Sequence, residues 1–236
     1  MVIDTKKMFK TGFHVFELLT WLDDELTEVF VVNLKTGEVT DMVTDPTYSA
    51  HHANAYETDD NKLIVDIAPT PYNNLRDYLS IENMLNPPEV SKDVSTSGEG
   101  QALTRYVLNM EAKKISHSTF PNTIKSKFIN SFVPTINEEY RGREYCIVYG
   151  WSAMDYSRMS LVKKNVCDST KDKLFYLEDH YSSEMHFLAN PEKWSEDDGV
   201  LVTIVFDGPK EQSYLLLMDA LTFQPITTAY LPHNIP

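Results

Sequence analysis

The sequence has few cysteines, a deficit of basic residues and no long apolar run, and each shortage excludes a class of protein. Two cysteines in 236 residues, Cys146 and Cys167, are too few for a disulfide framework or a cysteine-based metal site. Lysine and arginine total 21 against 35 acidic residues, and the resulting charge of −14 disfavours nucleic acid as a partner. No stretch approaches the ~18 consecutive apolar residues of a membrane-spanning helix. We therefore expect a globular, cytoplasmic protein with reduced cysteines.

Compact catalytic motifs are missing as well. The sequence has no glycine-rich phosphate loop, no G-x-S-x-G elbow and no H-E-x-x-H pair. These patterns mark nucleotide chemistry, triad hydrolysis and compact zinc sites, so none of these activities is supported.

Short β-branched and aromatic runs separated by turn residues dominate the chain, which predicts an all-β protein. Residues 28–43 (EVFVVNLKTGEVTDMV) predict two strands joined by a Lys-Thr-Gly turn, and residues 158–179 and 213–231 repeat this plan. Repeated hairpins favour consecutive antiparallel blades of a β-propeller, here an incomplete one, with a β-sandwich as the alternative. Further strands are predicted at 63–68, 103–110, 143–150 and 199–206.

Other segments complete the predicted organisation. Residues 73–85 (NNLRDYLSIENML) are the one segment with good helical spacing. Residues 86–100 are rich in proline, serine and glycine and predict an exposed connection. Residues 1–27 are expected to form an N-terminal extension without assigned structure, and residues 28–236 a partial propeller domain.

The stretch 49–57, SAHHANAYE, contains two adjacent histidines. Neighbouring side chains on a strand point to opposite faces, so His51 and His52 cannot both line one site. Simple alternation predicts two sets of side chains: His51, Ala53, Ala55 and Glu57 on one face, and His52, Asn54 and Tyr56 on the other. A neutral imidazole suits iron, copper or zinc, and the alternative is one buried and one exposed histidine without a metal.

A second unusual segment surrounds Glu184, which lies two residues before His186. Glu184 is either a solvated residue at the start of a strand or a carboxylate that accepts the outer N–H of a ligand histidine. The acidic residues 196–199 (EDDG) predict a turn before a core strand.

The segments HHANAYE, LIVDI, EYRGREYCIVYG, SSEMHFLANPEKWSEDDGVLVTIVFDG and YLLLMDALTFQPITTAYLPHNIP, in this order, resemble the carotenoid oxygenase family. The likeness is to its animal branch of β-carotene oxygenases and the isomerohydrolase of the retinal pigment epithelium, and it covers about residues 28–236. The resemblance implies a seven-bladed β-propeller that holds Fe(II) with four histidines. It also implies O2-dependent cleavage of a conjugated double bond in a carotenoid or apocarotenoid.

The resemblance assigns an iron-ligand role to His51 and a supporting role to Glu184, as the carboxylate that hydrogen-bonds a ligand histidine. It implies no catalytic residue beyond the metal site, and the other three histidine ligands fall outside this chain. A further family glutamate is replaced here, at Ser131 or Phe132. The resemblance also leaves open a peripheral contact of the protein with a membrane.

The chain is therefore expected to be the C-terminal half of an iron-dependent dioxygenase, inactive on its own. It would be a truncated product, a partial gene model or a degenerate relative. The alternatives are a carotenoid- or retinoid-binding relative that has lost the iron site, and a propeller that serves only as an interaction module.

Overall fold

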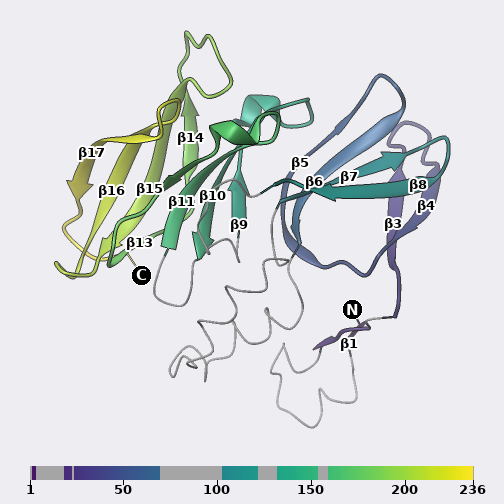
Figure 1. Ribbon diagram of the computed structural model, residues 1–236, viewed down its shortest axis with the longest axis horizontal. Helices are drawn as coiled ribbons and strands as arrows, with labels where there is room; N and C mark the ends of the chain where they lie inside the picture. Colours follow the sequence, from purple (N-terminus) through teal and green to yellow (C-terminus); the bar gives the residue numbers. More distant parts are fainter. Residues whose placement is uncertain are drawn as a thin grey trace.

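The structure is a computed structural model that describes residues 2–3, 19–22, 24–69, 103–121, 132–153 and 159–235. Within these ranges the chain forms antiparallel β-sheets and short 3-10 turns, and no α-helix (Figure 1). This confirms the all-β prediction. The helix predicted at 73–85 and the connection predicted at 86–100 lie outside the described residues.

Three larger sheets, named sheets I, II and III, follow one another along the chain. Sheet I contains, in spatial order, β5 (Ser49–Glu57), β6 (Lys62–Pro69), β7 (Thr104–Asn109) and β8 (Lys114–Thr119). Sheet II contains β9 (Phe132–Thr135), β10 (Ile147–Ala153), β11 (Met159–Asn165) and β12 (Lys173–Phe175). Sheet III contains β13 (His180–Ser182) and β14 (His186–Ala189), both beside β15 (Gly199–Asp207), then β16 (Gln212–Asp219) and β17 (Gln224–Tyr230).

Two smaller sheets precede them. β1 (Val2–Ile3) pairs with β2 (Leu19–Thr20), and β3 (Thr27–Val32) pairs with β4 (Val39–Thr44). The β3–β4 hairpin turns at Gly37, whose φ of +75° favours glycine. The hairpins predicted within 28–43, 158–179 and 213–231 are all present, whereas the strand predicted at 143–150 begins only at Ile147.

The strands of each larger sheet run outward in chain order, so the earliest strands lie at one edge. We name the edge formed by β5, β9 and the pair β13 and β14 the first-strand edge. β5 and β9 are in contact, and sheets I, II and III fan out next to one another (Figure 1). Residues of β5 and β9, which are far apart in the sequence, therefore lie close together.

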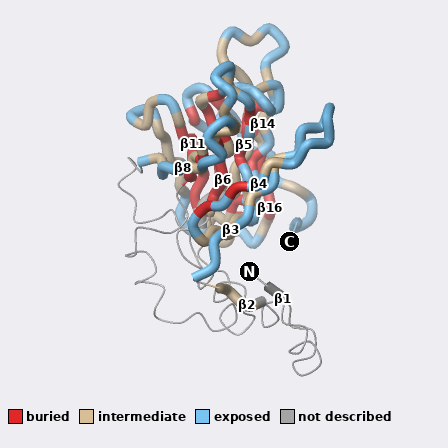
Figure 2. Tube along the Cα trace, turned by 90° about the vertical axis from the view of Figure 1, so that its right-hand side faces the viewer, coloured by how far each residue is buried: buried red, intermediate tan, exposed pale blue. Residues whose placement is uncertain are grey.

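Apolar cores lie between successive sheets, where the buried residues concentrate (Figure 2). Tyr56, Ile64 and Val148 belong to the core between sheets I and II. Leu201 and Leu216 belong to the core between sheets II and III. Each fully buried aliphatic side chain of this kind contributes ~1.5–3 kcal/mol, which makes face-to-face packing of the sheets the main source of stability.

The cysteines differ from the prediction. Cys146 and Cys167 form a disulfide, with Cα atoms 5.2 Å apart. Pairing of β10 with β11 brings them together, and the Val166 N–H donates to the Cys146 carbonyl at 2.8 Å. The prediction of reduced cysteines was wrong because one disulfide needs only two neighbouring residues and no framework. The expected cytoplasmic location loses the support that it drew from them.

Within the described ranges, no helix has the length and apolar character needed to cross a bilayer.

Candidate functional site

Two bulges decide which residues of β5 share a face. The pairing with β6 skips Ala50 between Ser49 and His51, and it skips Ala53 between His52 and Asn54. Directly paired residues of antiparallel strands project to the same side, and each bulge adds one residue and inverts the alternation. Simple alternation therefore does not hold along this strand.

His51 pairs with Ala68, and Asn54 pairs with Asp66, so His51 and Asn54 share one face. His51 is half-buried and His52 is exposed, which fits the prediction that the two histidines point to opposite faces. The prediction that His51 shares its face with Ala55 and Glu57 was wrong, because the bulge at Ala53 moves them to the other side.

The face of His51 is directed at sheet II and contains a buried ionic network. Arg105 donates two hydrogen bonds to the carboxylate of Asp66, at 2.9 and 2.7 Å, and Asp66 is fully buried. Tyr145, in the link that leads into β10 of sheet II, donates its hydroxyl to the same carboxylate at 2.7 Å. Burial, followed by the charge of Asp66, raises the pKa of Tyr145, so this phenol stays protonated as a donor. The network joins sheets I and II next to the strand that carries His51.

The family glutamate that is replaced at Ser131 or Phe132 would lie at the start of β9, the strand that neighbours β5. β9 begins at Phe132 and contacts β5 at the first-strand edge, whereas Ser131 lies outside the described residues. The fold thus brings the start of β9 to the same edge as the strand of His51.

Glu184 lies in the link between β13 and β14, at the first-strand edge of sheet III. Glu184 and His186 are both exposed. No group of three or more histidine, cysteine or acidic side chains within the described ranges could hold a metal ion. His51 therefore lies at the edge of sheet I and Glu184 at the edge of sheet III, and neither belongs to a ligand cluster within the described ranges.

The acidic turn before β15 has a role that the sequence analysis missed. The carboxylate of Glu196 accepts the backbone N–H groups of Cys146, at 2.9 Å, and Ile147, at 2.7 Å. Asp197 accepts a hydrogen bond at 2.6 Å from Lys163, which is 3% exposed. The turn therefore joins sheet III to sheet II, and no local pattern in the sequence reveals partners so far away.

The pKa values of the two carboxyls move in opposite directions. Burial raises the pKa of Glu196, and the backbone N–H groups of Ile147 and Cys146 only partly oppose it. Burial also acts to raise the pKa of Asp197, but the hydrogen bonds from Lys163 and Ser195 outweigh it and the pKa is lowered. Both shifts have a structural cause in the contact between sheets II and III.

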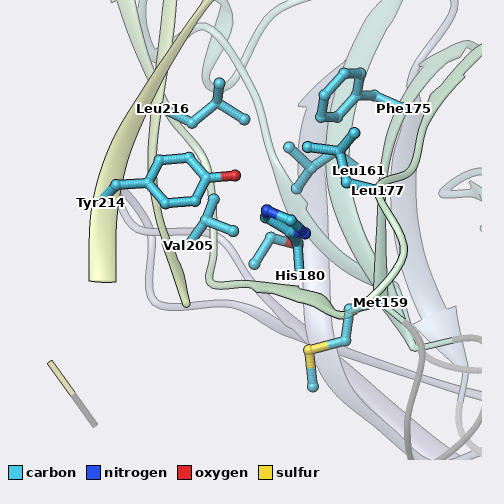
Figure 3. Close-up of a pocket in the computed structure, with 9 residues that line it drawn as sticks. Met159, Leu161, Phe175, Leu177, His180, Val205, Tyr214 and Leu216 are labelled. Carbon is cyan, nitrogen blue, oxygen red and sulfur yellow. The ribbon is translucent and has the colours of Figure 1, made fainter. Parts of the chain in front are cut away.

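A small pocket between sheets II and III is a further candidate site (Figure 3). Its volume is about 10 Å³, which is room for about one water molecule. The Ser182 hydroxyl on its wall is buried without a hydrogen-bond partner, and burial raises the pKa of the nearby Tyr214 to about 12. The remaining lining residues are His180, Met159, Leu161, Phe175, Leu177, Val205 and Leu216. A polyene does not fit here.

Comparison with solved structures defines the fold. The structure matches a cobalt-substituted Synechocystis ACO with a TM-score of 0.71 and 21% identity, covering 93% of this chain and 44% of that one. It matches an ACO/RPE65 chimera with a TM-score of 0.74 and 21% identity, over the same shares of the two chains. Sheets I to III are consecutive antiparallel blades of a carotenoid-oxygenase β-propeller, and within the described ranges they form an incomplete one.

Comparison of sequences defines the family. Residues 1–236 match the family described as retinal pigment epithelial membrane protein, and the chain belongs to this family of carotenoid oxygenases. It is 27% identical over 245 residues to the β,β-carotene 15,15'-dioxygenase of Gallus gallus, covering 92% of this chain and 45% of that protein. It is 26% identical over 241 residues to the chloroplastic carotenoid cleavage dioxygenase 8 of Arabidopsis thaliana, covering 96% and 40%. The chain spans less than half the length of these curated relatives.

Proposed function

We propose that this chain is the C-terminal part of an iron(II)-dependent carotenoid oxygenase, in which His51 is one of the iron ligands. The complete protein would use O2 to cleave a conjugated double bond of a carotenoid or apocarotenoid. The observation that supports this most directly is the family match over residues 1–236, together with the half-buried position of His51 at the first-strand edge.

The described residues fit iron only in part. His51 can supply one imidazole, but no group of three or more candidate ligands exists within the described ranges. A metal ion is retained against water when several ligands are held together. When bound, iron would supply the oxygen chemistry, and the residues described here would hold one ligand in place. On this basis we propose that the 236-residue chain is inactive alone.

A second candidate function belongs to the same family. A relative that has lost its iron site could bind a carotenoid or retinoid without cleaving it, and the replacement of the family glutamate at Ser131 or Phe132 supports that alternative. Upstream ligand histidines and a Phe-His-Gly segment beyond Pro236 would distinguish the enzyme from the binding protein. Their presence in the full transcript supports cleavage, and their absence supports binding alone.

Several expectations remain predictions. They are the division into residues 1–27 and residues 28–236, the cytoplasmic location, and contact with a membrane surface.

The proposed reaction is tested by incubating a longer chain that contains all four family histidines with a carotenoid and O2. Chromatography should show aldehyde or ketone products that form only when O2 and iron are present. The 236-residue chain is the matched control and should give none. Products from a His51→Ala variant of the longer chain, at the rate of the unchanged protein, would contradict the proposal.

Glu184 has a proposed role that depends on the length of the chain. In the family the matching glutamate supports a histidine that follows the present end of the chain, so Glu184→Gln should not change metal binding by the 236 residues. In a chain extended through the Phe-His-Gly segment, the same change should weaken iron binding or activity by ~10–100-fold. A change in metal binding by the short chain would refute the assignment.

A further inference from the structure

Asn54, three residues after His51, uses its whole side-chain amide to hold β5 in place. The amide is buried, with 5% of the residue exposed. Its Nδ2 donates to the carbonyl oxygens of Tyr140 at 3.0 Å and Arg143 at 3.1 Å. Its Oδ1 accepts the N–H of Gly142 at 3.0 Å and that of Ala55 at 3.0 Å. These four bonds use both donors and the full acceptor capacity of the amide.

Three of these bonds leave sheet I and end on one turn of sheet II. This turn follows the 3-10 helix Glu138–Tyr140 and leads from β9 to β10. Gly142 has a φ of +74°, which favours glycine and turns the backbone polar groups of the loop toward β5. Asn54 thus replaces the backbone hydrogen bonds that two separate sheets cannot make with each other.

The bulge at Ala53 makes this contact possible. Without the extra residue, Asn54 would point to the opposite face from His51, away from sheet II. With it, His51 and Asn54 project from the same face of a short strand segment. A second polar contact closes the other bulge, since the Ser49 hydroxyl donates to the His51 carbonyl at 2.8 Å, with the Ala68 carbonyl 2.9 Å away.

We propose that Asn54 is a positioning residue that fixes the bulged strand β5 against sheet II and thereby sets the place of the His51 imidazole at the first-strand edge. The use of that imidazole as an iron ligand depends on the proposed function, whereas its placement by Asn54 does not. A metal-free measurement of His51 therefore tests this inference separately.

Asn137 offers a matched control. It is 2% exposed, donates from Nδ2 to the Glu196 carbonyl at 2.9 Å and accepts the Glu139 N–H at 3.1 Å. It thus joins two segments of the chain by the same chemistry, but at the contact of sheets II and III. Loss of either amide removes a buried hydrogen-bonding group, and only Asn54 lies on the strand of His51.

The experiment compares Asn54→Ala with Asn137→Ala in the 236-residue chain, in the presence of a chelator. Carbethoxylation of His51 and His52 is followed by mass spectrometry, and the ratio of the two rates is the readout. In Asn54→Ala the ratio for His51 over His52 should rise about fivefold or more, because losing a buried hydrogen-bond partner increases local opening. Asn137→Ala should leave the ratio within about twofold. An unchanged ratio in Asn54→Ala, or equal changes in both variants, would overturn the proposal.

Two additional measurements cover a failure of Asn54→Ala to fold. Asn54→Asp keeps the acceptor for Gly142 and Ala55 but places an oxygen opposite the Tyr140 and Arg143 carbonyls, so it should raise the same ratio as well. In the unchanged protein, the Gly142 amide should exchange slowly with solvent because Asn54 accepts its hydrogen. Exchange of the Gly142 amide at the rate of an exposed amide would also contradict the proposed role of Asn54.

Discussion

The contacts of sheet II with its two neighbours are built differently. Toward sheet I, the buried carboxylate of Asp66 is satisfied by Arg105 of a regular strand and by Tyr145. Toward sheet III, the buried ammonium of Lys163 is satisfied by Asp197 and by the Ala220 carbonyl, both of them in turns. The Asp66–Arg105 pair lies within sheet I and depends on the register of β6 and β7, and Tyr145, in the link before β10, reaches it from the side of sheet II. Toward sheet III, both partners of Lys163 belong to connecting turns.

The two contacts also differ in their aromatic residues. Between sheets II and III, Tyr149 stacks on Phe187 with ring centroids 5.6 Å apart and on Phe223 at 6.4 Å. Between sheet I and the link that leads into β10 of sheet II, Tyr56 and Tyr145 meet edge to face, with ring centroids 6.3 Å apart. Stacked rings tolerate small shifts, whereas a bidentate ion pair does not. The strand that carries His51 thus pairs with the strand whose Asp66 requires the more exact geometry.

The largest expected effect comes from Asp66→Ala. Removal of one partner of a buried ion pair leaves the other charge uncompensated, so the free energy of unfolding should fall by ~3–5 kcal/mol. Denaturant unfolding of the purified chain measures it, and Asp60→Ala, at an exposed carboxylate, is the control. A loss below about 1 kcal/mol would show that Arg105 finds an equivalent partner in water.

Removal of the disulfide tests sheet II itself, because sheet II takes part in both contacts. Cys146→Ser combined with Cys167→Ser opens a loop with a sequence separation of 21, and the free energy of unfolding should fall by ~3 kcal/mol. Calorimetry of this double variant should show both contacts loosening in one transition. Two separate transitions would mean that the contacts unfold independently.

Lys163→Met should have a smaller effect than Asp66→Ala. Methionine keeps much of the apolar stem, while Asp197 has a side chain 15% exposed and can recover part of its hydration. We expect the free energy of unfolding to fall by ~1–3 kcal/mol. A loss that equals or exceeds that of Asp66→Ala would reverse the ranking of the two contacts.

The smallest effect at neutral pH is expected from Tyr149→Phe. The Tyr149 hydroxyl is 3.5 Å from the Ala220 carbonyl, so its loss should change stability by less than ~0.5 kcal/mol. Burial, followed by the charge of Asp197, raises the pKa of Tyr149 above its usual value of 10.0. The folded state then keeps a proton that the unfolded state loses, so this contribution is complete below pH 10 and falls as the pH rises further.

Measuring the free energy of unfolding from pH 8 to pH 11.5 tests the direction of this pH dependence. Above pH 10 the stability of Tyr149→Phe should decline less steeply than that of the unchanged protein, by ~1.4 kcal/mol per pH unit. Identical slopes would mean that the Tyr149 phenol ionises as easily in the folded state.

The hairpins were predictable because they are local. The turn of residues 28–43, for example, is encoded by Lys35, Thr36 and Gly37, and the strands on either side form as expected. An alternation pattern does not reveal bulges. For this reason Ala55 and Glu57 were wrongly predicted to share a face of β5 with His51.

Contacts between sheets could not be predicted from the sequence. The Asn54 amide reaches residues 86 and 89 positions away, and nothing near Asn54 marks those partners. The role of Glu196 was missed for the same reason, since an acidic turn looks solvated until the fold brings backbone N–H groups to it. His51 and Glu184 were proposed as iron-site residues because their segments resemble those of a family.

The central proposal is that His51, and not His52, binds iron at the first-strand edge. The most direct test is the iron content, per chain, of a longer protein that contains the remaining family histidines, purified as His51→Ala and as His52→Ala. We predict that His51→Ala lowers bound iron by about tenfold or more and that His52→Ala leaves it unchanged, because the two imidazoles project from opposite faces of β5. Equal loss of iron in the two variants, or full retention in His51→Ala, would contradict this account.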